Sequence, residues 1–195
     1  IDRDANGLIK GVNYTFNEEG LIDWRKIVKT EHLVPNRQRT KETDVSNLED
    51  RDLLILLSGI KELAQIRGYT SLDYNVVSPS PSYVVATCSI AWVPNFETEG
   101  REVRFSAIGD ASHSNTENFA RFFLGPIAEN RAFVRCVRNF LRINIVGQDE
   151  ISNLKGASIA APAQAENQSD PRYLLQQVMT EKGVGLEAIK RKMVK

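Results

Sequence analysis

The sequence predicts an α+β domain in which a three-stranded antiparallel β-meander is followed by a long basic helix, a β-β-β-α core with flanking helices. Three runs of residues alternate between apolar and polar side chains, as strands do: 69–77, 83–93 and 101–108. Turn-forming residues separate them, SPSPS at 78–82 and PNFETEG at 94–100. Residues 115–144 then carry apolar and basic side chains at helical spacing.

The composition is that of a globular protein, with 42% hydrophobic and 26% charged residues in a chain of 195. The formal net charge is zero, so affinity for nucleic acid must come from local clustering of basic side chains. Cys88 and Cys136 are the only cysteines, and their spacing supports neither a zinc site nor a disulfide framework. The longest apolar run, Leu53 to Leu57, is too short for a bilayer helix, and there is no signal-like segment. We therefore expect an intracellular protein without a membrane partner.

Residues 1–47 are expected to form an N-terminal arm and a helix. The first 20 residues are polar and predict a weakly structured arm, and 21–33 have helical periodicity that Pro35 ends. The run RQRTKET follows and contributes Arg37, Arg39 and Lys41. On its own evidence this run is a solvated loop, and the functional alternative is an arm that contacts phosphates.

Residues 48–146 are expected to form the core. A helix over 48–67 with Gly68 as its C-cap precedes the three strands. The polar loop GDASHSNT at 109–116 follows them, and Ser114 or Asn115 is expected to cap the last helix. Gly125-Pro126 predicts a kink or break, with a straight helix from about Ile127 to Asn144.

A narrow basic stripe runs along that last helix. At about 100° per residue, Arg131, Arg135, Arg138 and Arg142 fall within an arc of roughly 60°. A neighbouring arc is apolar and predicts the side that packs on a core: Phe119, Phe123, Ile127, Val134, Val137 and Leu141.

The composition changes at Gly147. Residues 147–169 are rich in small polar side chains and predict a linker. Residues 170–195 predict a small tail module of two short helices, begun by the capping pair Asp170-Pro171. The module is too small to bury a core of its own, so a protein partner for it is possible.

No enzyme motif is present among the common ones. The sequence lacks GxxxxGK[ST], GxGxxG, GxSxG and HExxH, so we expect no catalytic residues, no resident metal and no cofactor. One cluster of carboxylates, Asp110 with Glu97, Glu99 and Glu102, leaves a metal-dependent nuclease as an alternative hypothesis.

A binding function has more support. The four helix arginines, with Arg104 on the adjacent strand, could line a groove that tracks a phosphate backbone, because arginine forms bidentate bonds with phosphate. The alternative is a solvated helix face paired with Glu117 and Glu129. Six nearby aromatic residues either stack on bases or pack in the core: Tyr83, Trp92, Phe96, Phe105, Phe133 and Phe140.

The order of these elements, with the segments GYTSLDYNVV, YVVATCSIAWVP, EVRFSAIGDAS and ENRAFVRCVRNFLRIN, resembles the Rad-fifty-two family of single-strand annealing proteins, in particular its short phage and bacterial members. The resemblance covers about residues 48–145. In that family the last helix carries a basic pair and a following arginine that bind single-stranded DNA around an oligomeric ring. Arg135 and Arg138 match the second basic residue and that arginine, whereas Val134 stands where the family often has lysine.

The resemblance implies binding of single-stranded DNA and ATP-independent annealing of complementary strands in homologous recombination, repair or phage replication. It also implies a homo-oligomer, as a ring, with no catalytic chemistry. The alternative function is a non-enzymatic adaptor that binds other proteins in replication or virion assembly, without annealing activity.

Overall fold

The computed structural model of the protein describes residues 1–151 and has an α+β fold with two three-stranded sheets and one long helix. The predicted α+β class is therefore confirmed. Most of the predicted linker at 147–169 and all of the predicted tail module at 170–195 lie outside the described residues. Within residues 1–151, no helix combines the length and the apolar character needed to cross a membrane.

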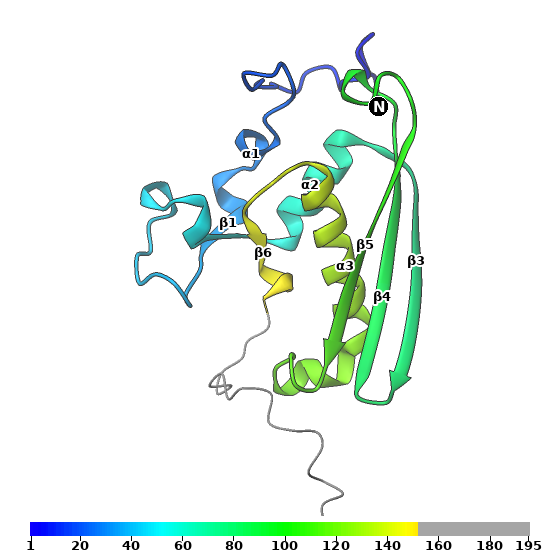
Figure 1. Ribbon diagram of the computed structural model, residues 1–195. Coiled ribbons are helices and arrows are strands. Elements are labelled where there is room, and N and C mark those ends of the chain that lie inside the picture. Colours follow the sequence, from blue (N-terminus) through cyan, green and yellow to red (C-terminus); the bar gives the residue numbers. More distant parts are fainter. Residues whose placement is uncertain (152–195) are drawn as a thin grey trace, which may run out of the picture. The chain divides into compact units, whose positions relative to one another are not determined.

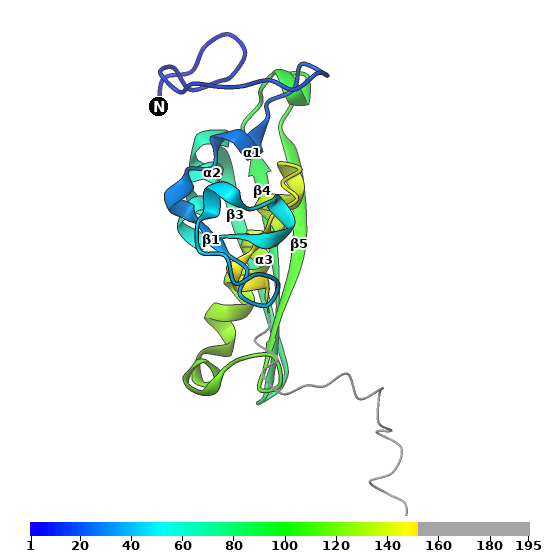
Figure 2. The same ribbon diagram turned by 90° about the vertical axis from the view of Figure 1, so that its left-hand side faces the viewer.

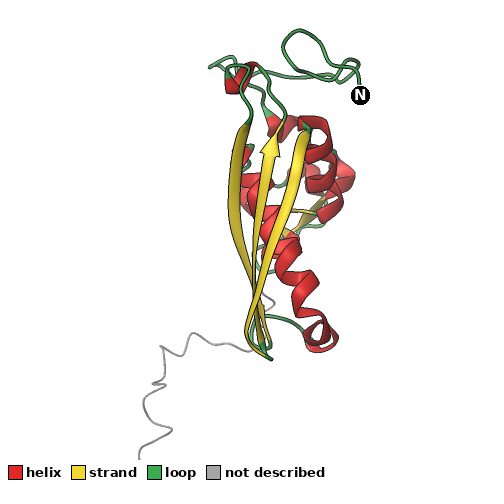
Figure 3. Ribbon diagram, turned by 90° about the vertical axis from the view of Figure 1, so that its right-hand side faces the viewer, coloured by secondary structure: helices red, strands yellow, loops and turns green. Residues whose placement is uncertain are grey.

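The larger sheet has the strand order β3-β4-β5, with both pairs antiparallel. Its strands are β3 (Tyr69–Ser80), β4 (Tyr83–Trp92) and β5 (Val103–Ser112). Burial alternates along β4, because one face of the sheet packs on the helices and the other does not (Figure 3). The buried positions of β4 nearest its start are Val84, Ala86, Cys88 and Ile90.

Two strand boundaries differ from the prediction. β3 continues through the proline-containing segment to Ser80, and β5 continues to Ser112 through the GDAS residues expected in a loop. Both extensions arise from pairing with β4, whose first residue, Tyr83, lies opposite Ser80 on one side and Ser112 on the other. Tertiary pairing therefore overrides the local turn preference.

The long helix α3 (Leu124–Phe140) lies along the buried face of this sheet. Its backbone comes very close to β5 at Gly109, where an added Cβ would be 2.3 Å from the Ala132 nitrogen and 2.6 Å from the Ala128 oxygen. Only glycine fits at this crossing. The glycine of the GDAS segment therefore has a packing role in joining α3 to the sheet.

The predicted break in the last helix is present but begins earlier. A 3-10 helix, Asn118–Phe123, comes first, and Pro126 then lies in the first turn of α3, where its missing N–H costs nothing. The helix ends at Phe140, not at Asn144 as predicted. Ser114 and Asn115 do not cap it, because the 3-10 helix separates them from α3.

The smaller sheet has the order β1-β2-β6, with β2 antiparallel to β1 and parallel to β6. Its strands are β1 (Leu33–Pro35), β2 (Leu53–Ile55) and β6 (Val146–Gly147). The three layers, small sheet, helices and large sheet, follow one another across the molecule (Figure 1), and Figure 2 looks onto the small sheet.

The two predicted N-terminal helices are shorter than expected. The first is α1 (Trp24–Ile27) followed by a 3-10 turn, Thr30–His32, and the second is α2 (Leu57–Arg67). Gly68 caps α2 with φ 80°, which confirms that prediction. The arm of the first 20 residues is more firmly attached than predicted, because Leu8 is buried in the core.

Candidate nucleic-acid interface

The arginines of α3 differ sharply in their surroundings. Arg131 is only 7% exposed, and its guanidinium donates to the backbone oxygens of Asp149 (2.8 Å), Asp110 (2.7 Å) and Asn115 (2.8 Å). It also donates to the Asn115 side-chain oxygen at 2.9 Å. Burial lowers the pKa of this guanidinium, although the charges of Asp110 and Asp149 oppose the shift. Arg131 therefore joins segments of the fold and cannot reach a ligand in this conformation.

Arg135 and Arg138, which we name the arginine clamp, share a single carboxylate. Arg138 binds Glu150 through two nitrogens, with Nε 2.7 Å from Oε1 and Nη2 3.3 Å from Oε2. The Nε of Arg135 donates to Oε2 at 3.2 Å. Two guanidinium charges against one carboxylate leave one net positive charge at the clamp. The side chain of Arg135 is 35% exposed and that of Arg138 is 17% exposed.

Glu150 lies in a 3-10 turn, Gln148–Glu150, that packs against α3. Burial alone would raise the pKa of its carboxyl, but the hydrogen bonds and charge of Arg138, with the Gly147 N–H and Arg135, together hold the pKa below its usual value. Glu150 is thus ionised in the folded protein at neutral pH. The alternative to a binding function paired the stripe with Glu117 and Glu129, whereas in the structure Arg135 and Arg138 pair with Glu150.

Arg131 and Arg135 also cover the free edge of the large sheet. β5 is an edge strand, and its Asp110 and Ile108 oxygens accept hydrogen bonds from Nη1 of Arg131 (2.7 Å) and Nη1 of Arg135 (2.6 Å). An uncovered edge strand offers unpaired backbone groups to other chains. Two arginines of the basic stripe therefore protect the edge strand β5 from pairing with other chains.

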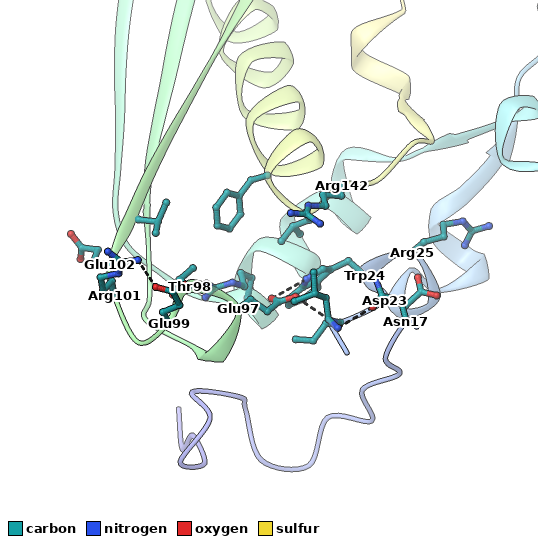
Figure 4. A pocket seen from close by; sticks show the side chains of 16 residues that line it. Asn17, Asp23, Trp24, Arg25, Glu97, Thr98, Glu99, Arg101, Glu102 and Arg142 are labelled. Atoms are coloured by element: carbon teal, nitrogen blue, oxygen red, sulfur yellow. Dashed lines mark hydrogen bonds and ion pairs between the residues drawn. The ribbon is translucent and has the colours of Figure 1, made fainter. Parts of the chain in front are cut away.

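Arg142 lies apart from the clamp, beyond the end of α3. Its φ is 56°, its side chain is 76% exposed, and its nearest acidic partner is Glu19 at 3.9 Å. It lines a cavity of about 720 Å³ (Figure 4), in which Glu97 accepts hydrogen bonds from the Ile22 N–H and Trp24 Nε1. The charged lining residues balance, four arginines against four carboxylates: Arg25, Arg67, Arg101, Arg142, Asp23, Glu97, Glu99 and Glu102. The balance gives this cavity no preference for an anion.

Arg104 lies on the opposite face of the large sheet from α3. Its guanidinium donates to Asp73 at 2.9 Å and to Ser71 at 3.2 Å, whereas its neighbour Phe105 packs toward the core. The predicted groove that combines Arg104 with the helix arginines is therefore wrong. Successive residues of a strand point to opposite faces, and Arg104 takes the open face.

The basic loop between β1 and β2 is solvated, as its composition favours. Arg37 donates to the backbone oxygens of Lys41 and Glu42, and Arg39 is 3.9 Å from Asp52. Arg37 and Lys41 are exposed. These residues belong to the small-sheet layer and form no hydrogen bond or ion pair with the clamp within residues 1–151.

The carboxylates proposed for a nuclease are not brought together. Asp110 lies near the end of β5 and Glu102 directly before its first residue, eight residues apart, which is about 27 Å along a strand. Asp110 instead accepts a hydrogen bond from Asn115 Nδ2 at 2.7 Å. Across residues 1–151 no group of three or more His, Cys, Asp or Glu side chains is arranged to hold a metal ion.

The aromatic residues expected near the stripe are mostly in the core. Trp92 is fully buried and Phe133 is 5% exposed, and Phe140 stacks on Trp92 with ring centroids 4.6 Å apart. Tyr83 is 38% exposed at the start of β4. Of these rings, Tyr83 is the most accessible to a base.

An exposed aromatic cluster precedes α3, and two of its three residues were expected to face the core. We name Phe119, Phe122 and Phe123 the phenylalanine cluster; they are 75%, 81% and 46% exposed. Their rings contact one another, with centroids 5.1 Å apart for Phe119 and Phe123. The prediction that Phe119 and Phe123 face the core is wrong, because the 3-10 helix turns them away from the face that α3 buries.

Glu150 is the site residue that the sequence did not reveal. It falls at the start of a segment whose composition predicts a linker, so no contact with the core was predicted for it. The one available signal is the acidic pair Asp149-Glu150, which only Gly147 and Gln148 separate from the apolar pair Ile145-Val146.

Comparison of the chain with protein-family models, with curated proteins and with solved structures finds no significant match.

Proposed function

We propose that the protein binds single-stranded DNA and promotes ATP-independent annealing of complementary strands. The observation that carries the proposal is the arginine clamp, in which two guanidinium groups converge on one anion and leave one net positive charge. Arginine forks match the oxygens of a phosphate, and such contacts hold a strand by its backbone without reading its sequence.

The clamp lies on the helix that follows the three-stranded sheet, where the resemblance to single-strand annealing proteins places the DNA-binding arginines. The arrangement β3-β4-β5-α3 is the β-β-β-α core of this proposal. A strand held by its phosphates keeps its base edges free, so that a second strand can test pairing without energy from ATP. The pairing step itself requires no hydrolysis of ATP.

Annealing in this family involves assembly of several copies, and we propose that this chain also self-associates. The phenylalanine cluster is an exposed apolar projection at one place on the molecule. A groove of about 290 Å³ lies at another, between α2, β3 and α3, and its apolar lining is Tyr69, Leu72, Tyr74 and Phe133. An exposed projection of one copy that enters a groove of the next joins copies head to tail, which yields a ring when the rotation closes.

Strand annealing tests the proposal directly. Two complementary oligonucleotides, one with a fluorescent donor and one with an acceptor, are mixed without ATP in the presence of the full chain. We expect the chain to accelerate the appearance of energy transfer, and Arg135→Gln with Arg138→Gln to remove the acceleration. Annealing at the protein-free rate with the wild-type chain would contradict the proposal.

The matched control replaces two arginines outside the clamp, Arg51→Gln with Arg101→Gln, whose side chains are 67% and 75% exposed. It removes the same charge without touching the clamp and is expected to anneal as the wild type does.

The exposed phenylalanine cluster also favours the second candidate, a protein-binding adaptor. That candidate predicts assembly or partner binding with no effect of the chain on annealing.

A further inference from the structure

The arginine clamp already holds an anion, the carboxylate of Glu150. Its two oxygens receive four N–H donors: Arg138 Nε and Gly147 N at Oε1, and Arg138 Nη2 and Arg135 Nε at Oε2. We propose that this cradle is one anion site with two alternative occupants, Glu150 in the free protein and a backbone phosphate in the complex. The inference rests on the proposed function and adds an internal competitor to it.

The two occupants exclude each other for two reasons. The donors that converge on Glu150 are the ones a phosphate would use, and each N–H is already directed at a carboxylate oxygen at 2.7 to 3.3 Å. A phosphate beside an ionised carboxylate would also be repelled by a like charge in a partly buried site. The strand must therefore displace Glu150 to reach both arginines.

The 3-10 turn that carries Glu150 has few bonds to the rest of the protein, whereas the strand β6 directly before it is firmly packed. Upstream, Gly147 pairs with Ile55 in the small sheet and packs so closely on Val134 that an added Cβ would meet its side chain. The 3-10 turn itself is held by Arg131 Nε at the Asp149 oxygen and by the four bonds to Glu150. Loss of the Glu150 bonds thus leaves the turn held by the Arg131 bond to the Asp149 oxygen and leaves the strand β6 in place.

Neutralising the competitor should strengthen DNA binding. In Glu150→Gln the competing charge is lost, and one of the two acceptor oxygens becomes an NH2 group that cannot accept from the clamp, so affinity for a short oligonucleotide should rise about 5-fold or more, the usual size of coupling between two linked sites. The plot of log affinity against log salt concentration should also become steeper. In Glu150→Gln a phosphate no longer replaces an internal carboxylate, so each such contact should add about 0.7 to the slope.

The matched control is Asp149→Asn, because it changes the net charge by the same amount at the neighbouring residue. Within residues 1–151 the Asp149 side chain forms no ion pair with Arg135 or Arg138, which pair with Glu150. We expect Asp149→Asn to bind with nearly wild-type affinity and an unchanged salt slope. The idea is overturned if Glu150→Gln keeps its far-ultraviolet circular dichroism and binds no tighter than Asp149→Asn.

A measurement on the wild-type chain covers the case in which Glu150→Gln does not fold. The Gly147 N–H donates to Glu150, and the Ile151 N–H closes the 3-10 turn at the Gln148 oxygen. Saturating oligonucleotide should make both amides exchange with deuterium faster, by roughly 10-fold or more if the turn opens. Unchanged or slower exchange at both amides in the complex would rule out displacement of Glu150.

The two proposals fail in different ways. If the wild-type chain does not bind oligonucleotides, the proposed function is wrong. If it binds, and Arg135→Gln with Arg138→Gln weakens binding, but Glu150→Gln has no effect, the function stands and the internal competitor is wrong.

Discussion

Arg138 and Glu150 form a two-point ion pair across twelve residues of chain, with Nε 2.7 Å from Oε1 and Nη2 3.3 Å from Oε2. The pair ties the last turns of α3 to the 3-10 turn that follows β6. It also places a carboxylate where a nucleic-acid phosphate would have to bind. The same two residues therefore link the stability of this region to its proposed function.

Arg131 should matter for stability, whereas Arg104 should not. Arg131→Gln removes a buried guanidinium with four hydrogen bonds and leaves backbone oxygens without donors, at a cost of roughly 3 kcal/mol in the free energy of unfolding. Arg104→Gln makes the same charge change at a side chain that is 54% exposed and should cost less than about 1 kcal/mol. Urea unfolding of both variants gives the comparison, and equal losses would contradict the structural role of Arg131.

Gly109 should tolerate no side chain. Gly109→Ala drives a Cβ into the Ala132 nitrogen and the Ala128 oxygen, so α3 must shift from the sheet, and we expect a loss of about 3 kcal/mol or more. Gly125→Ala is the control, because an added Cβ there meets nothing within 4 Å; in the first turn of a helix it should stabilise by up to about 1 kcal/mol. Thermal unfolding distinguishes them, and similar melting temperatures would show that the close crossing is not rigid.

The strands of the large sheet were predictable because one face packs on helices and the other is open. That arrangement makes burial alternate along β4, and alternation is a local property of the sequence. The run Leu53 to Leu57 shows the limit of this reasoning. It is apolar throughout, so periodicity does not distinguish strand from helix, and β2 forms only because β1 and β6 lie beside it.

The surroundings of the arginines could not be read from spacing. The helical period places Arg131, Arg135 and Arg138 on one side of α3, but their partners are backbone oxygens of β5 and a carboxylate twelve residues beyond Arg138. Backbone acceptors leave no trace in composition. The composition of the segment with Glu150 predicts a linker. In the structure, pairing of β6 with β2 brings this segment against α3.

Arg142 occupies a backbone conformation that favours glycine. It follows the C-cap of α3 with φ 56°, and the Ile143 N–H closes the turn on the Arg138 oxygen at 2.9 Å. Arg142→Gly should therefore stabilise the chain by up to about 1 kcal/mol. Arg142→Ala removes the same charge but keeps the Cβ, so it should give no such gain in urea unfolding. If both variants are equally stable, backbone strain at this position is negligible.

The stability provided by Glu150 should depend on pH. Its folded-state pKa is held below the usual value, so its contribution is present above the unfolded pKa and is lost as the pH falls through the folded pKa. The difference in unfolding free energy between the wild type and Glu150→Gln should therefore be largest above about pH 5 and shrink below about pH 4. Urea unfolding across this range tests it, and a gap that grows toward low pH would contradict the ion pairing.

The phenylalanine cluster should control assembly. Phe119→Ser with Phe122→Ser removes two exposed rings from the proposed contact between copies and should shift the native mass, measured by light scattering, toward the monomer. Phe16→Ser is the control, because Phe16 is 51% exposed and packs on Phe96 outside the cluster. If the double variant assembles as the wild type does, the cluster is not the contact.

Equilibrium binding of a labelled single-stranded oligonucleotide tests the central claim most directly. Anisotropy titrations at about 50 and 200 mM salt should show binding by the wild type that weakens with salt. Arg135→Gln with Arg138→Gln should reduce the log–log slope by about 1.4 if both phosphate contacts release counterions, and by about 0.7 if one of them replaces Glu150. The control Arg51→Gln with Arg101→Gln should keep the wild-type slope. Equal binding by all three proteins, or binding by none, would contradict the assignment of the arginine clamp to nucleic acid.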